Sequence, residues 1–445
     1  MPQSEETKPR SPITRKDFLT GVGTAAAAVA GASAGVATSL GYSPAIVADN
    51  APIIIGDVDE SSGVYAISGS SQTLGKKVCI DEWNARGGVL GRKITMIHAD
   101  TAAKTDIALP AARKLVEQDK VDVLVGEVSS NVGLALSAYA QSVGIVYTAS
   151  GTHDTTITGS KANLCCFRTT AANAMLANAT ARSLLPYGKK WFFITPDYAY
   201  GHSAQQGFQA VLEANGGTML GNELTPFPNA SGDFTAQLTK GKNSGADVLI
   251  LSLYGGDLTN CIKQYVQGGY DKAFKQIGGP LNGVEVAVGY GPDSNRGIWG
   301  APWAPDYPTE GSRNLGKKLL AAGAQYVDWR MYLGWLAAEA TITGILRAGT
   351  TDATRLVKAM EDLTFNGLQK KFCHIRACDH QNELEVLVTE AIPKSQWKFP
   401  NQYFAIRKFE PASQTLVTCD KSEAPARLAS QTVPTRENYT PKGKA

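Results

Sequence analysis

From residue 53 onward, short apolar runs alternate with stretches in which apolar residues recur at helical spacing. The first run, residues 53–55, ends at Gly56, as a buried parallel strand does. Leu74, Val78 and Trp83 follow at helical spacing, and a Gly-Gly pair ends that helix. Strands that alternate with helices predict an α/β fold of parallel sheets, flanked by helices and joined by right-handed crossovers.

The same cycle repeats along the chain. Further strands are predicted at 93–98, 121–125, 145–147, 191–194 and 248–251, and further helices at 108–118, 133–141 and 202–215. No long linker rich in proline or serine separates the two runs of elements. We therefore expect two lobes joined by short crossings rather than two domains on a flexible tether.

The first 48 residues have the organisation of an export signal. A basic run at 14–19 precedes an uncharged Ala/Gly-rich stretch, and small residues end at Ala48. The run resembles a twin-arginine signal, with Lys16 in the second arginine position. Length alone would allow a membrane span, but the many glycines weaken an unpacked helix. We predict that residues 1–48 are cleaved and that the protein acts in the periplasm; a retained anchor is the alternative.

Charge and motif content exclude several function classes. The net charge is +3, and it falls to +2 without residues 1–48, so no electrostatic footprint for nucleic acid exists. The sequence has no Gly-x-Ser-x-Gly elbow, Walker A loop or His-Glu-x-x-His motif, and no Cys/His spacing suits zinc. Adjacent His153 and Asp154 cannot easily form a triad with Ser130. We expect no enzyme, no cofactor and no metal.

The seven cysteines allow disulfides in an exported protein. Cys373 and Cys378 could close a short loop, although the connectivity otherwise cannot be read. Cys79 and Cys261 lie in helical stretches and are interpreted as buried small hydrophobic residues.

Ligands of open parallel sheets bind beyond the carboxyl ends of the strands. Two such turns carry small hydroxyl residues: Ser129 and Ser130 in one, and Ser150 and Thr152 in the other. The free N–H groups of a helix start, together with these hydroxyls, could form a nest for a carboxylate. The alternative is that these side chains are only N-caps.

The second run of elements offers aromatic side chains at its strand ends. Tyr200 and Tyr254 each follow a strong apolar strand and combine a flat apolar face with one hydroxyl. Tyr198 is interpreted as a half-buried turn residue. The segment 299–307, rich in tryptophan and proline, is either a rigid surface segment or a cleft rim.

From about residue 53 to about residue 419, the chain resembles the type I periplasmic solute-binding proteins of ABC importers, in the leucine/isoleucine/valine-binding group. The resemblance rests on the runs 84–93 (NARGGVLGRK), 125–130 (VGEVSS), 148–152 (TASGT), 167–169 (FRT), 197–201 (DYAYG) and 379–381 (DHQ). The Asn-x-x-Gly-Gly run is the most specific of these. The others support it by their order and spacing.

The resemblance implies a two-lobed clamp with a three-crossing hinge. It places lobe one at 50–168 plus 300–367, lobe two at 169–299 plus 368–425, and a tail at 426–445. It implies that Ser130, Gly151 and Thr152 hold a ligand carboxylate, with Tyr200 and Tyr254 facing it from the second lobe. Ser129, Ser150 and Asn282 complete the expected ligand-binding set.

One departure from the family pattern concerns the ligand's ammonium group. Amino-acid binders of this group carry an acid just after a Gly-Pro pair in the second lobe, and here that pair precedes Leu281 and Asn282. A buried ammonium without a counter-charge is costly. Either the ligand is an aromatic or other organic carboxylate without an ammonium, or Glu285 or Asp257 takes the role of that acid.

The resemblance and the export signal predict a monomeric receptor that captures a small carboxylate-bearing ligand. It would deliver this ligand to an ABC permease in the inner membrane. The alternative is a ligand-sensing module of the same fold, which recognises amides or amino acids without transport.

Overall fold

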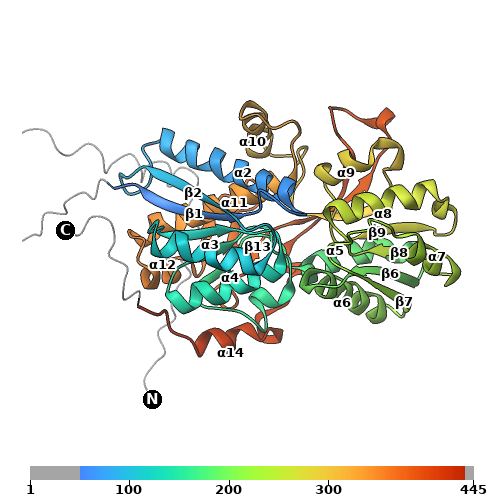
Figure 1. Ribbon diagram of the computed structural model, residues 1–445, viewed down its shortest axis with the longest axis horizontal. Coiled ribbons are helices and arrows are strands. Elements are labelled where there is room, and N and C mark those ends of the chain that lie inside the picture. The colour runs from blue at the N-terminus through green and yellow to red at the C-terminus, as the bar shows by residue number, and fades with distance from the viewer. Residues whose placement is uncertain (1–50, 436–445) are drawn as a thin grey trace, which may run out of the picture. The chain divides into compact units, whose positions relative to one another are not determined.

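The computed structural model describes residues 51–435, which form two lobes, each built on its own sheet (Figure 1). The first sheet has the order β2-β1-β3-β4-β5, and all its neighbouring strands are parallel. Its strands are β1 (Ile53–Asp59), β2 (Ile94–Asp100), β3 (Val123–Gly126), β4 (Tyr147–Ala149) and β5 (Cys166–Arg168). The helices associated with this lobe are α2 (Ala66–Ala85), α3 (Thr105–Glu117), α4 (Ser130–Val143), α10 (Glu310–Ala321), α11 (Trp329–Ala348) and α12 (Ala353–Met360).

The second sheet has the order β15-β14-β10-β9-β8-β6-β7. The five strands from β10 to β7 are parallel, whereas β14 and β15 are antiparallel additions at one edge. Its strands are β6 (Lys190–Pro196), β7 (Thr218–Thr225), β8 (Val248–Leu251), β9 (Gln276–Gly279), β10 (Ile298–Ala301), β14 (Val386–Ala391) and β15 (Phe404–Glu410). Its helices are α5 (Asn173–Leu184), α6 (Ala199–Ala214), α7 (Thr235–Asn243), α8 (Gly255–Gln267) and α9 (Val284–Tyr290).

The remaining elements are short. Three of them form a small antiparallel sheet: β11 (Leu363–Phe365), β12 (Cys373–Ile375) and β13 (Asn382–Glu383). Two short helices near the C-terminus are α13 (Ala412–Thr415) and α14 (Ala424–Ala429). The 3₁₀ turns are η1 (Thr155–Thr158), η2 (Leu185–Tyr187), η3 (Tyr270–Lys272), η4 (Pro292–Ser294), η5 (Lys394–Gln396) and η6 (Cys419–Lys421).

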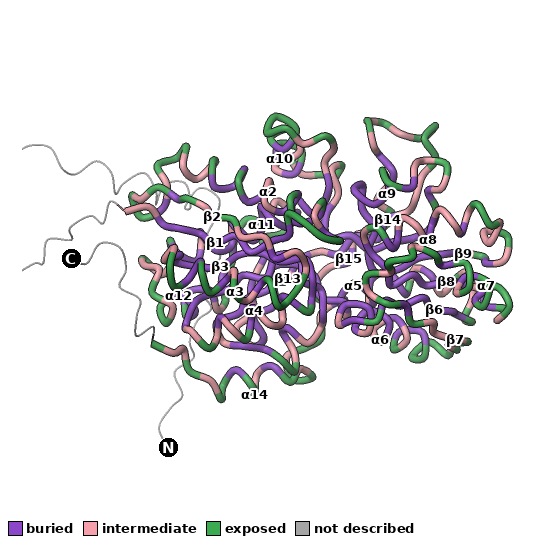
Figure 2. The backbone as a smooth tube through the Cα atoms, in the orientation of Figure 1, coloured by how far each residue is buried: buried purple, intermediate pink, exposed green. Residues whose placement is uncertain are grey.

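The predicted α/β fold with parallel sheets is confirmed, and every predicted strand and helix is present, most of them with shifted bounds. One shift concerns Gly56, which is not a strand end. β1 continues in register with β2 as far as Asp59. A Cβ on Gly56 would lie 2.9 Å from Leu124 Cδ2, so this glycine allows close packing inside the sheet. The central strands are buried on both faces, as parallel sheets require (Figure 2).

Two of the runs that carried the family resemblance meet where the chain crosses between the lobes. Arg168, at the end of β5, pairs as an isolated bridge with Gln381. Arg168 Nε donates to Gln381 Oε1 at 2.6 Å, and Asn382 Nδ2 donates to the Thr169 carbonyl at 2.9 Å. The Phe167 ring stacks on His380 at 4.1 Å between centroids. These contacts bind two crossing strands of the hinge to each other.

The C-terminal segment runs back from the second lobe to the first (Figure 1). A disulfide joins Cys378 to Cys419, so the suggested Cys373–Cys378 loop is wrong, and Cys373 is a free, buried thiol. Cys373 lies in β12 and is held in the small sheet, which explains why the nearer pairing does not form. Beyond the disulfide, Arg427 and Gln431 each donate to the Ala162 carbonyl of the first lobe. Cys79 and Cys261 are buried, as predicted.

The segment 299–307 is not a surface segment, because its large aromatic side chains belong to the core. Trp299, Trp303 and Tyr307 are fully buried. Trp303 stacks on Tyr332 at 5.2 Å between centroids and donates from Nε1 to Ser312 Oγ.

No helix in the described part of the chain is long and apolar enough to cross a membrane. The export signal at 1–48 lies outside the described residues. The lobe bounds inferred from the resemblance remain a proposal.

Candidate functional site

The carboxyl ends of strands from both sheets meet across a buried interface. Tyr65, which precedes α2 in the first lobe, places its hydroxyl 2.6 Å from that of Tyr198 in the second. Ser68 Oγ donates to Glu285 Oε1 of α9 at 2.5 Å, again across the two lobes. All four side chains are buried. Tyr198 is therefore an interlobe contact, and the interpretation as a half-buried turn residue is wrong.

The turn after β4 brings together the predicted residues Ser150, Gly151 and Thr152, all fully buried. Neither Ser150 Oγ nor Thr152 Oγ1 has a hydrogen-bond partner within residues 51–435. A Cβ on Gly151 would lie 2.6 Å from Gln72 Oε1 and 2.8 Å from Arg330 Nη1, so only glycine lets both side chains approach this turn. The turn thus presents two buried hydroxyl groups that are free to bind a ligand.

The turn after β3 differs from the predicted anion nest. The N–H of Ser129, the N-cap residue of α4, donates to Glu127 Oε1 at 2.7 Å and to Glu60 Oε1 at 3.1 Å. The chain's own carboxylates therefore occupy this N–H group. Ser130 Oγ accepts the N–H of Asp154 at 3.2 Å, which links the two turns. Both serines are buried, but they serve the protein's internal hydrogen bonding more than an open nest.

The predicted second-lobe residues lie in different surroundings. Tyr254 is the N-cap residue of α8, and its hydroxyl donates to Glu285 Oε1 at 2.7 Å. Tyr200, in the first turn of α6, is buried, and its hydroxyl has no partner among the described residues. Asn282 points away from both: its Nδ2 donates to Tyr290 OH at 3.2 Å, inside the second lobe.

An arginine that the sequence interpretation missed lies between the lobes. Arg330, the second residue of α11, is 2% exposed. Its Cζ lies 4.6 Å from the centre of the Tyr254 ring and 4.4 Å from that of Trp329. Its Nη1 donates to the Gly151 carbonyl at 3.2 Å. A single charged side chain near the start of an apolar helix was the available signal, but no strand precedes it, so the strand-end rule did not select it.

Of the two acids considered for an ammonium group, Glu285 lies in this site. Its Oε1 is 3.9 Å from Arg330 Nε, and its Oε2 has no partner in the described range. Burial raises the pKa of Glu285, although the charge of Arg330 opposes the shift. Asp257, in the first turn of α8, instead accepts the N–H of Asn229 at 3.4 Å.

Burial shifts the pKa values of the neighbouring titratable groups. Burial raises the pKa of Asp328 to about 7, and the charge of Glu285 adds to the shift. Burial and then the charge of Arg330 lower the pKa of His153 well below its usual value. His153 Nδ1 lies 2.8 Å from the Ala171 carbonyl and must donate to it, so neutral Nε2 is a free acceptor. Asp154 Oδ1 accepts the N–H of Thr156, and the Nδ1 bond of His153 goes to the Ala171 carbonyl.

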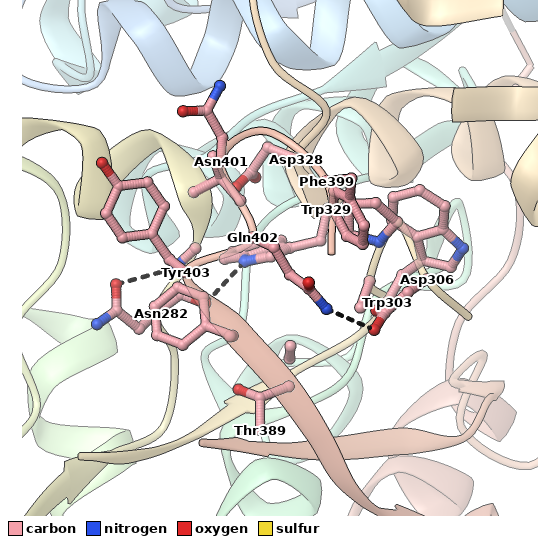
Figure 3. A pocket seen from close by; sticks show the side chains of 16 residues that line it. Asn282, Trp303, Asp306, Asp328, Trp329, Thr389, Phe399, Asn401, Gln402 and Tyr403 are labelled. Carbon is pink, nitrogen blue, oxygen red and sulfur yellow. Dashed lines mark hydrogen bonds between the residues drawn. The ribbon is translucent and has the colours of Figure 1, made fainter. Parts of the chain in front are cut away.

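A small cavity of about 30 Å³ adjoins the interface on the far side of Trp329 (Figure 3). Its lining includes Asn282, Trp303, Trp329 and Tyr403, and Gln402 Nε2 lies 3.4 Å from Asp306 Oδ2 at one end. Trp329 Nε1 donates to the Asn282 carbonyl at 3.0 Å, which fixes the tryptophan between cavity and interface. This cavity has room for about one water molecule. Across residues 51–435, no group of three or more His, Cys, Asp and Glu side chains could hold a metal ion.

A family model described as periplasmic binding protein matches residues 52–396. The chain belongs to the periplasmic binding protein family. A Leu/Ile/Val-binding protein homolog of Brucella suis is 28% identical over 259 residues, which cover 56% of this chain and 62% of that protein. The Leu/Ile/Val-binding protein BraC3 of Rhizobium johnstonii is 29% identical over 226 residues, covering 50% and 59%. The match thus spans about three fifths of these relatives.

Solved structures of this family have the same fold. A periplasmic binding protein of Burkholderia mallei superposes with a TM-score of 0.79 at 24% identity, covering 84% of this chain and 98% of that one. A solute-binding protein of an ABC transporter from R. palustris, in complex with benzoate, gives 0.72 at 23% identity, covering 81% and 97%. The membership in the type I leucine/isoleucine/valine-binding group is confirmed.

Proposed function

We propose that this protein is the extracytoplasmic solute-binding component of an ABC importer. It captures a small carboxylate-bearing ligand between its lobes and delivers it to a permease in the inner membrane. One observation supports this most: buried donor atoms from both sides of the interface lack partners within residues 51–435, namely the hydroxyls of Ser150, Thr152 and Tyr200 and the Nε of Arg330. Buried polar groups are normally satisfied, so such a cluster fits a polar ligand.

The ligand is a branched-chain amino acid or an aromatic or other organic acid. Relatives named as Leu/Ile/Val-binding proteins support the first class, and the similarity in fold to a benzoate complex supports the second. Ser150, Thr152 and Tyr200 are the proposed hydroxyl contacts, with Tyr254 lining the site. Ser129, Ser130, Gly151 and Asn282 shape the surrounding turns.

A thermal-shift screen of the exported part tests this function directly. The probes are leucine, isoleucine and valine, their amides, their deaminated acids, benzoate and hydroxybenzoates. A ligand that binds only the folded state raises the melting temperature by mass action, so binders of either acid class will show a saturable shift. If amides alone shift the melting temperature, the protein belongs to the sensing alternative, which is also favoured if no permease and ATPase genes adjoin this one.

The localisation proposal is tested separately. We propose that residues 1–48 direct export and are removed, which leaves a periplasmic protein that acts as a monomer. N-terminal sequencing of protein recovered from the periplasm should begin near Asp49. An intact Met1 in the membrane fraction would instead establish the retained anchor.

A further inference from the structure

Two arginines within residues 51–435 are fully buried, and they differ in how their donors are used. Each nitrogen of the Arg168 guanidinium has an acceptor: Nε donates to Gln381 Oε1, Nη1 to the Asp154 carbonyl and Nη2 to Thr158 Oγ1. Arg330 donates from Nη1 to the Gly151 carbonyl, but its Nε has no partner within the described residues. Arg168 fits a structural role at the hinge, whereas Arg330 has a donor to spare.

The guanidinium plane of Arg330 packs against aromatic rings, whereas the edge that carries Nε remains available for a hydrogen bond. The rings of Tyr254 and Trp329 lie within 4.6 Å of Cζ, so the guanidinium is held by cation–π contacts. Its nearest carboxylate, Glu285, is 3.9 Å from Nε, which is beyond hydrogen-bonding distance. A planar fork held in this way is suited to the bidentate binding of a carboxylate.

The other anion site of the interface is already filled. The Ser129 N–H is taken by Glu127 and Glu60, so the helix start of α4 offers a ligand less than the sequence pattern suggested. Gly151 connects Arg330 to the turn that carries the free hydroxyls of Ser150 and Thr152. Arg330 is therefore the buried cation beside the free donors of the first lobe.

We propose that Arg330 is the residue that selects carboxylate ligands, by receiving the ligand carboxylate on its free edge beside Ser150 and Thr152. This proposal rests on the proposed function and deepens it. A ligand whose carboxylate is replaced by a neutral amide gains no charge-assisted bond there. The protein should therefore discriminate strongly between an acid and its amide, and Arg330 should account for that discrimination.

The test compares each of two acids with its own amide by calorimetry on the exported protein. The pairs are 4-methylpentanoate with 4-methylpentanamide, and benzoate with benzamide. Arg330→Lys keeps a charge but loses the planar fork, and Arg330→Gln loses the charge. We expect acid binding to weaken roughly 10- to 100-fold in Arg330→Gln, with amide binding little changed. Arg168→Lys is the matched control: it should lower the melting temperature but keep the acid-to-amide ratio.

Glu285→Gln covers the case in which Arg330 variants do not fold. The amide of this variant retains an oxygen for the Ser68 and Tyr254 hydroxyls and removes the negative charge beside Arg330. Binding of 4-methylpentanoate or benzoate should tighten severalfold. An unchanged acid-to-amide ratio in folded Arg330 variants, or weaker acid binding by Glu285→Gln, overturns the role of Arg330 and leaves the solute-binding function standing. If wild-type protein binds no acid, the carboxylate part of the proposed function fails as well.

Discussion

Two buried threonines near the end of β4 differ in whether their hydroxyl groups have a hydrogen-bond partner. Thr148 Oγ1 lies 2.8 Å from Thr341 Oγ1, so its hydroxyl is satisfied within the first lobe. Thr152 Oγ1 is as deeply buried and has no partner among residues 51–435. An unsatisfied buried hydroxyl costs about 1–3 kcal/mol, which a ligand oxygen would recover. The methyl group of Thr152 meanwhile packs against Gly133, where a Cβ would come within 2.3 Å of it.

Thr152→Val should therefore separate binding from folding. Valine keeps the methyl group that packs on Gly133 and removes only the unpartnered hydroxyl. We expect an unchanged or slightly higher melting temperature without ligand, and acid binding weaker by roughly 1–3 kcal/mol. Thr148→Val is the control, since it should destabilise the lobe and leave the affinity alone. Full affinity in folded Thr152→Val would show that its hydroxyl does not contact the ligand.

Glu285 decides whether an ammonium group is recognised. Its Oε2 is buried and has no partner among the described residues, so this oxygen can face a ligand there. If the ligand is an amino acid, Glu285→Gln should weaken leucine binding at least tenfold, because a buried ammonium would lose its counter-charge. The same variant should tighten the binding of 4-methylpentanoate. Parallel calorimetry with both ligands checks this, and a loss of affinity shared by both would point to a structural defect.

At the scale of elements, the ends of β1 and β3 place Asp59, Glu60 and Glu127 against the start of α4. Burial, and then the charge of Glu60, raise the pKa of Glu127 well above its usual value. Glu127 adopts a left-handed φ of +88° that brings its carboxyl group to the Ser129 N–H. Glu60 Oε2 and Glu127 Oε2 both lack a donor within the described part of the chain.

The raised pKa of Glu127 predicts a pH dependence of stability. A carboxyl group with a raised folded-state pKa stabilises the protein below its unfolded pKa, and the contribution is lost as pH rises through the folded value. Asp59, whose pKa is raised to about 8 by burial, acts in the same direction. The free energy of unfolding should thus fall between about pH 5 and pH 8. Glu127→Gln mimics the protonated group and should flatten that slope in urea titrations, whereas the exposed Glu117→Gln should not. An equal slope in Glu127→Gln would show that the raised pKa of Glu127 does not cause the pH dependence.

The sequence predicts the strands and helices more completely than it predicts the residues of the candidate site. Strands and helices follow from periodicity, and Ser150, Thr152 and Tyr254 were proposed as site residues because each follows a strand. Arg330 was not found, since α11 begins at the interface after a loop rather than after a strand. The contact of Glu60 with the start of α4 was not predicted, because Gly56 indicated an earlier end of β1 than the structure has. The antiparallel strands β14 and β15 depend on contacts with distant residues, which local patterns do not record.

At the scale of the whole described chain, the lobes are held by contacts that a hinge motion would break. The Tyr65–Tyr198 hydroxyl pair and the Ser68–Glu285 bond cross the interface beside the proposed ligand. A ligand shifts such an equilibrium only as far as it prefers one state. A ligand that contacts Arg330 and Thr152 on one lobe and Tyr200 on the other prefers the closed state.

Closure on the ligand should be measurable as a change in size. X-ray scattering of the exported protein should give a smaller radius of gyration at ligand saturation than without ligand. Tyr65→Phe removes one interlobe hydrogen bond, worth about 1 kcal/mol, and should shift the ligand-free equilibrium toward the open state by roughly fivefold. Its radius without ligand should then equal or exceed that of wild type, while saturation brings both to the same closed value. Identical dimensions of wild type with and without saturating ligand would count against a hinge, because the interlobe contacts would then be permanent and the ligand would have to enter by another route.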